Sequence, residues 1–275
     1  MAETSWATRH VRLLISAPIL ALLVLAAVGA DLLAPYDPFA IDARNILQGP
    51  SAAHPFGTDE IGRDVLSRVI FGARISLSVA GAAVLVATLV GVPIGLVAAY
   101  AGGRTENAVM RTIDLFVSLP EIFVAIVVMA FLTNSLPTLI FTIGLLYFPQ
   151  FARVTHSVAA SIRRKEFVEA AISLGMGPVR IMMREILPNL LSVIIVQVSF
   201  TLSFAMLLEA GLSFLGLGVM PPQPSWGQMV GALKDYLFQN PWPVVFPSLA
   251  LFLAVLAINL LGDWLQDRLN PELAR

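Results

Sequence analysis

The segment over residues 153–188 carries the side chains whose types and spacing most clearly indicate a function. Its distinctive residues are Glu169, Ala170, Ala171, Gly175, Leu187 and Pro188. Apolar residues from Phe167 to Leu174 recur at i, i+3, i+4 and i+7, which predicts an apolar stripe on a helix over residues 156–174. Gly175 ends this helix, and Gly177-Pro178 begins another. Such a stripe on a rigid bend favours docking into a groove of another protein; an interfacial helix on lipid headgroups is the alternative.

Two carboxylates lie inside or near apolar stretches. Glu121 follows Pro120, and Glu209 lies near the end of the apolar run over residues 189–214. Burying an ionised carboxylate in a bilayer is costly, so each is a candidate for function by default. For Glu209 we expect a structural role in which it pairs with an outer loop. For Glu121 we expect packing or gating of a pathway rather than a proton relay.

The sequence shows no signature of catalysis or of nucleotide binding. It has no G-x-x-x-x-G-K-[ST] phosphate loop, so we expect no ATP site in this chain. There are no cysteines, and the three histidines are isolated along the sequence. We therefore expect a non-catalytic protein with no metal site and no cofactor of its own.

Composition indicates a membrane protein. Of the 275 residues, 57% are hydrophobic and 13% are charged, whereas soluble domains have about 45–50% apolar and about 25% charged residues. This excludes a soluble globular enzyme and a disordered chain. The formal net charge of −1 gives no basic excess of the kind that indicates nucleic-acid binding.

Apolar runs of about 20 residues, the length that crosses a bilayer, predict an all-α polytopic protein of six transmembrane helices. The expected spans cover residues 13–33, 75–99, 113–132, 136–151, 189–214 and 244–261. A polar loop with a short helix over residues 63–71 follows the first span. A loop rich in proline and glycine precedes the sixth span. The expected divisions are an anchor helix with an external loop (1–73), a membrane core (74–265) that contains the loop 153–188, and a tail (266–275).

Lysine and arginine placement predicts the orientation. With the N-terminus inside, twelve of the 17 basic residues fall in cytoplasmic segments and the other five fall outside. Cytoplasmic loops of membrane proteins carry the excess of these residues. Both termini and the segment 153–188 are therefore expected in the cytoplasm.

The motif Glu169-Ala170-Ala171-x-x-x-Gly175, followed by Leu187-Pro188, resembles the EAA signature of bacterial ABC importer permeases. The isoleucine of that pattern falls on Glu185, with Ile186 one residue later. Two further segments resemble the branch of the family that serves dipeptides, oligopeptides and nickel. They are HPFGTDEIGRDVLSR at 54–68, continuing FGAR at 71–74, and EAGLSFLGLG at 209–218, followed by PP at 221–222 and PSWG at 224–227.

The resemblance implies the permease fold and a set of partners. It implies a homologous second permease subunit, two ATP-binding subunits that hold ATP and Mg²⁺, and an extracytoplasmic substrate-binding protein. In that family the EAA loop docks on the ATP-hydrolysing subunit, a role that carries over here to Glu169, Ala170, Ala171 and Gly175. The expected location is the bacterial inner membrane, in contact with lipid.

Peptides are the substrate that the resemblance favours, with nickel and glutathione as alternatives. A proton-coupled secondary transporter that uses Glu121 and Glu209 is the other transport hypothesis, and a membrane scaffold without transport is a third. Internal repeats, which secondary transporters often show, are not evident.

Overall fold

The computed structural model describes residues 6–132 and 134–269, and within these ranges it is helical with no strand. The helices are α1 (Trp6–Val28), α2 (Ala30–Leu33), α3 (Val65–Ala101), α4 (Gly103–Val117), α5 (Glu121–Phe131), α6 (Leu136–Arg163), α7 (Glu166–Ser173), α8 (Pro178–Ile181), α9 (Leu187–Phe214), α10 (Trp226–Leu233) and α11 (Trp242–Leu269). A π-helical segment (Met182–Ile186) joins α8 to α9, and a 3-10 turn (Lys234–Tyr236) follows α10. The expected all-α class is confirmed. Residues 270–275 of the expected tail lie outside the described residues.

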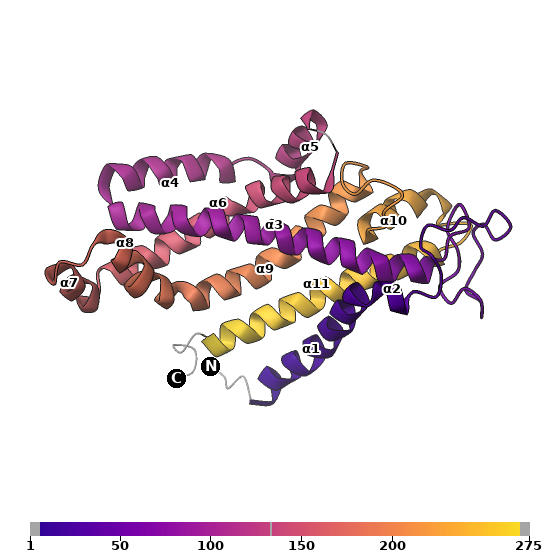
Figure 1. Cartoon of the computed structure of the whole chain (residues 1–275), viewed down its shortest axis with the longest axis horizontal. Helices are drawn as coiled ribbons and strands as arrows, with labels where there is room; N and C mark the ends of the chain where they lie inside the picture. Colours follow the sequence, from indigo (N-terminus) through magenta and orange to yellow (C-terminus); the bar gives the residue numbers. More distant parts are fainter. Residues whose placement is uncertain (1–5, 133, 270–275) are drawn as a thin grey trace.

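The long helices form one bundle (Figure 1). α3 packs against α6 and α9, and α1 packs against α11, which also contacts α9. α7 and α8 lie at one end of the bundle, which we call the α7 end. Residues 34–64 and α10 lie at the opposite end, which we call the α10 end. The loop with the predicted docking motif is therefore well separated from the longest polar loop.

Six helical units follow the order of the six expected spans: α1, α3, the α4–α5 pair, α6, α9 and α11. Four helices are long and apolar enough to cross a membrane: α1, α3, the continuous helix Pro178–Phe214, and α11. The α4–α5 pair qualifies as a bent unit. α6 is more polar, but its 28 residues give about 42 Å at the helical rise, longer than the bilayer core.

The third expected span is not one straight helix. α4 and α5 meet at an angle of 85°, with the break at residues 118–120. Pro120 has no N–H to donate to a preceding turn, and its ring disfavours the helical conformation at Leu119. The span expected over 113–132 is therefore a bent pair of helices, because the chain breaks at this proline.

Small residues bring α3 and α6 into close contact. A Cβ atom at Gly91 would overlap the carbonyl oxygen of Phe148, and one at Gly95 would overlap that of Ala152. Only glycine lets the two backbones approach this closely, which is the use of the G-x-x-x-G pattern in membrane helices. This contact fixes α6 along most of its length and so positions the loop that follows it.

Several helices, among them α3 and α6, are longer than the spans predicted from sequence. α3 begins at Val65, where Asp64 caps it by accepting a hydrogen bond from the Ser67 amide at 2.8 Å. The short helix expected over 63–71 is therefore its first turns. α6 continues to Arg163, twelve residues beyond the expected end of its span.

Candidate functional site

The predicted docking loop is a short helix between two long ones. The helix expected over 156–174 is interrupted, because α6 ends at Arg163 and Lys165 is extended, with φ −80° and ψ 147°. α7 then begins at Glu166. The single helix predicted from the apolar spacing was wrong, because no periodicity marks this break.

Gly175 forms the bend after α7, as predicted. Its φ is +76°, in the left-handed region that favours glycine. The Met176 amide donates to the Ala171 carbonyl at 3.1 Å, and the Gly175 amide donates to the Ile172 carbonyl at 2.9 Å. These two bonds are the Schellman arrangement that ends helices at a glycine. The three-residue gap between Ala171 and Gly175 is therefore the spacing that this helix end requires.

The apolar stripe predicted for this loop divides between two faces of α7. Val168 and Ala171 are buried in the core cluster that also contains Ile162 and Ile181. Phe167 and Ala170, by contrast, are exposed. The large apolar side chains exposed on this loop are Phe167, Ile172, Leu174, Val179 and Met183. Leu174 is 84% exposed, so the α7 end presents apolar surface that none of the described residues covers.

Glu169 and Ala170 lie on the exposed side of α7. Glu169 is in the first turn of the helix, where a carboxylate is stabilised by the helix dipole. Its backbone carbonyl accepts a hydrogen bond from Ser173 Oγ at 3.0 Å. The carboxylate belongs to no ion pair within the described residues and is free to meet a partner.

Leu187 and Pro188 lie at the junction of the π-helical segment with α9. The sequence placed the start of the fifth span at this proline, but the helix is continuous from Pro178 to Phe214. Pro188 cannot donate to Arg184, its partner in a regular α-helix, and the wider π turn accommodates this. Leu187 is half-buried and Pro188 is exposed. α8, the π-helical segment and α9 therefore form one continuous rod, whereas α7 is separated from it by the bend at Gly175.

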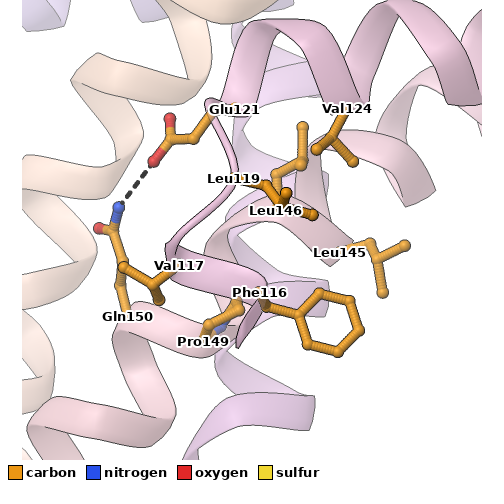
Figure 2. A pocket seen from close by; sticks show the side chains of 9 residues that line it. All are labelled: Phe116, Val117, Leu119, Glu121, Val124, Leu145, Leu146, Pro149 and Gln150. Carbon is orange, nitrogen blue, oxygen red and sulfur yellow. Dashed lines mark hydrogen bonds between the residues drawn. The ribbon is translucent and has the colours of Figure 1, made fainter. Parts of the chain in front are cut away.

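Glu121 lies at the break between α4 and α5 (Figure 2). Its Oε1 accepts a hydrogen bond from Gln150 Nε2 of α6 at 3.1 Å. The two residues line a cavity of about 70 Å³. The remaining lining residues are Phe116, Val117, Leu119, Val124, Leu145, Leu146 and Pro149. The carboxylate and the amide are thus the polar groups of an otherwise apolar cavity.

Glu209 is fully buried near the α10 end of α9. It accepts hydrogen bonds from Ser213 Oγ at 2.8 Å and from Ser76 Oγ of α3 at 3.1 Å. Ser76 Oγ also accepts a hydrogen bond from the Trp226 amide at 3.3 Å, which links α10 to this group. The structure therefore places Glu209 and Glu121 at different sites. The functional roles predicted for them remain predictions.

The α10 end contains an ionic cluster that the sequence analysis did not single out. Asp59 binds Arg63 at 2.6 Å and Arg68 at 3.4 Å, and all three are buried. Arg68 also donates to Gln228 Oε1 of α10 at 3.3 Å. The segments 54–68 and 209–227, recognised separately in the sequence, therefore meet here. The density of Asp and Arg within 59–68 was the available signal.

The described residues form an all-helical bundle with a bent third unit and the predicted docking loop at one end. The chain belongs to the family of binding-protein-dependent transport system inner membrane components, whose family model matches residues 91–275. It is accordingly a multi-pass component of a transport system.

Three relatives are permease proteins of named transport systems. The chain is 40% identical over 250 residues to the dipeptide transport system permease protein DppC of Alkalihalophilus pseudofirmus, covering 91% of this chain and 82% of the relative. It is 38% identical to the glutathione transport system permease protein GsiD of Pectobacterium atrosepticum, over 92% of this chain and 84% of that one. It is 37% identical to the nickel transport system permease protein NikC of Escherichia coli K12, over 93% of this chain and 92% of that one.

A solved structure shares the fold. The structure of the MetNI methionine ABC transporter in inward facing conformations matches with a TM-score of 0.62 over 75% of this chain and 96% of that chain, at 19% identity. The expected permease fold is therefore confirmed.

Proposed function

We propose that the chain is one of two homologous permease subunits of an ATP-driven importer for dipeptides and oligopeptides. ATP and Mg²⁺ are held by two partner subunits, and an external binding protein delivers the substrate. The observation that carries this proposal is the α7 loop, a rigid bend that presents exposed apolar side chains at one end of a membrane bundle. Membership of a binding-protein-dependent transport family supports it.

The α7 loop is suited to an ATPase groove because its backbone is fixed before docking. Val168 and Ala171 anchor α7 to the bundle, and the Gly175 turn holds the exposed side chains in one place. A preordered surface loses little conformational entropy on binding. Exposed Phe167 and Leu174 provide the apolar contacts, and Glu169 provides a charge for the rim of the interface.

The continuous helix Pro178–Phe214 transmits movement of this loop across the membrane. When ATP closes the two ATPase subunits, the loops move with them and α9 moves as a rod. At its other end α9 is tied to α3 through Glu209 and Ser76. This linkage favours a rigid-body switch between inward-facing and outward-facing states.

The proposed orientation places the α7 end and both termini in the cytoplasm. The α10 end then faces the binding protein. The buried ion pairs of Asp59, Arg63 and Arg68 give the loop at this end a fixed shape, which suits a docking surface for that protein. The excess of basic residues in the segments assigned to the cytoplasm supports it as well.

Peptides are the proposed substrate because relatives named for dipeptide and di/tripeptide transport are 40% and 38% identical to this chain. Nickel and glutathione remain alternatives, on the relatives named for their transport.

Copurification tests the partners, and competition tests the substrate. A tagged chain should bring down a second permease and ATPase subunits, and the ATPase activity of this complex should rise with loaded binding protein. Uptake of a labelled dipeptide should be suppressed by unlabelled dipeptides but not by nickel. Isolation of the chain without any ATPase subunit would contradict the proposed complex, and suppression by nickel alone would contradict the peptide substrate.

A further inference from the structure

We infer that Glu121 and Gln150 form a recognition point for a positively charged ammonium group in the translocation pathway. The inference deepens the proposed function and rests on it: the ligand is the protonated amino group of a peptide. The starting observation is the cavity at the α4–α5 break, in which a carboxylate and an amide are held together among apolar side chains.

The site lies near the middle of the bundle, away from both of its ends. Gln150 is at the middle of α6, 14 residues from Leu136 and 13 from Arg163. At the helical rise each half of α6 is about 20 Å long. Glu121, which is bonded to Gln150, is therefore far from both ends of the bundle.

The charge of Glu121 is not neutralised by a basic side chain within the described residues. Arg153, one turn further along α6, is paired with Asp114 at 2.6 Å. Glu121 instead accepts a hydrogen bond from Gln150, has the buried phenol of Tyr147 beside it, and lies in the first turn of α5, where the helix dipole favours a negative charge. These groups stabilise the Glu121 carboxylate without neutralising its charge, so the carboxylate can still bind a cation.

The break cannot face lipid. The backbone at residues 118–120 is irregular and exposed in this chain, and Leu119 is 53% exposed. Irregular backbone at membrane depth is tolerated only where protein covers it or where it lines a water-filled cavity. In an importer with two homologous permeases, this face therefore borders the partner subunit and the pathway between them.

The lining chemistry identifies the class of ligand. Apolar side chains such as Leu145 and Val124 form most of the wall and accept a side chain of variable type. The carboxylate attracts an ammonium group and repels anions. A bare metal ion is disfavoured because the described residues contain no group of three metal-ligating side chains. An organic cation with an apolar body, such as a short peptide, fits these features.

The experiment measures local charge and occupancy with cysteine probes in the complete importer. The chain contains no cysteine, so Val117→Cys, which lines the cavity, introduces a unique thiol in this subunit. The rates at which it reacts with a cationic trimethylammonium thiosulfonate and with an anionic sulfonate thiosulfonate are measured by mass spectrometry, with and without Glu121→Gln. Val127→Cys, an exposed valine of α5 outside the cavity, is the matched control.

The cationic reagent should react at Val117→Cys faster than the anionic reagent by about fivefold or more, because a unit charge lies nearby. This preference should be absent in Glu121→Gln and at Val127→Cys. In the nucleotide-free complex, a dipeptide should slow labelling at Val117→Cys more than its N-acetylated form does, and Glu121→Gln should abolish that difference.

An unreactive thiol at Val117→Cys, a reagent preference equal to that at Val127→Cys, or equal protection by both peptides would overturn the inference. The comparison of the two cysteine sites uses native Glu121, so the test is decisive even if Glu121→Gln does not assemble. ATP-dependent dipeptide uptake is measured on the same complexes. Uptake without these effects refutes the recognition point alone, whereas absence of uptake in the unmodified complex refutes the proposed function.

Discussion

Replacing Gly175 by alanine tests whether the shape of the α7 loop, rather than its composition, determines docking. The ideal Cβ position at Gly175 has no atom within 4 Å, so the substitution causes no clash within this chain. Its effect comes from φ of +76°, where an L-residue costs about 1–2 kcal/mol. This corresponds to a decrease of about 5–30-fold in the population of the native bend.

Gly177 is the matched control. It also has open space around its Cβ position, but its φ is −69° and its ψ is 152°, which any residue adopts. Gly177→Ala should therefore weaken docking less than Gly175→Ala, because its cost is limited to that of alanine at the N-cap of α8 and alanine also restricts the unfolded loop. Gly175→Val should cost more than Gly175→Ala, since a branched side chain is worse in the left-handed region.

The assay is the affinity of detergent-solubilised permease pairs for the ATPase subunits, together with ATP-dependent uptake after reconstitution. Gly175→Ala should weaken binding about 5–30-fold at normal abundance of the permease pair, and uptake should fall with it. Equal behaviour of Gly175→Ala and Gly177→Ala would refute the reasoning, because only Gly175 of the two has the positive φ that alanine disfavours.

Three further predictions concern packing, buried polarity and topology. Gly91→Ala should lower the free energy of unfolding of the purified complex by about 1–3 kcal/mol, because the added methyl group overlaps α6. Gly81→Ala, on the same helix but with open space around the added methyl group, should not lower it. Equal shifts of the melting temperature in the two variants would contradict this prediction. Glu209→Leu should destabilise the complex by about 1–3 kcal/mol, because it leaves serine hydroxyls unpaired. Glu209→Gln should destabilise the complex less. The reverse order of melting temperatures would be inconsistent with a hydrogen-bonding role. Cysteine at Lys165 should react with impermeant reagents only from the cytoplasm and cysteine at Gln223 only from outside, so labelling of both from one side would exclude six spans in the proposed orientation.

The class of fold and the helix end at Gly175 were predictable from the sequence because both depend on local chemistry. Apolar runs of sufficient length require helices in a bilayer. A left-handed residue at a helix end requires glycine, so the spacing from Ala171 to Gly175 is visible in the sequence. The resemblance of the EAA motif added the partner subunits, which no local rule provides.

The sharpness of the break at 118–120 and the division of α7 into two faces were not predicted, because both depend on neighbouring helices. Pro120 permits a break, but the 85° angle depends on how α5 packs against α6. Val168 is buried because the end of α6 and α8 fold over it, which periodicity cannot show. The sequence predicted a separate short helix over 63–71 in a polar loop, yet the charges over 59–68 pair with one another and α3 begins at Val65.

Reconstitution with defined energy sources tests the central claim most directly. Proteoliposomes that contain this chain, its partner permease, the ATPase subunits and the binding protein should import a dipeptide only with ATP and Mg²⁺. That import should persist when an ionophore collapses the proton gradient, and vesicles with this chain alone should import nothing. Gradient-driven uptake by this chain alone, lost in Glu121→Gln at normal abundance, would contradict the account and establish a proton-coupled carrier.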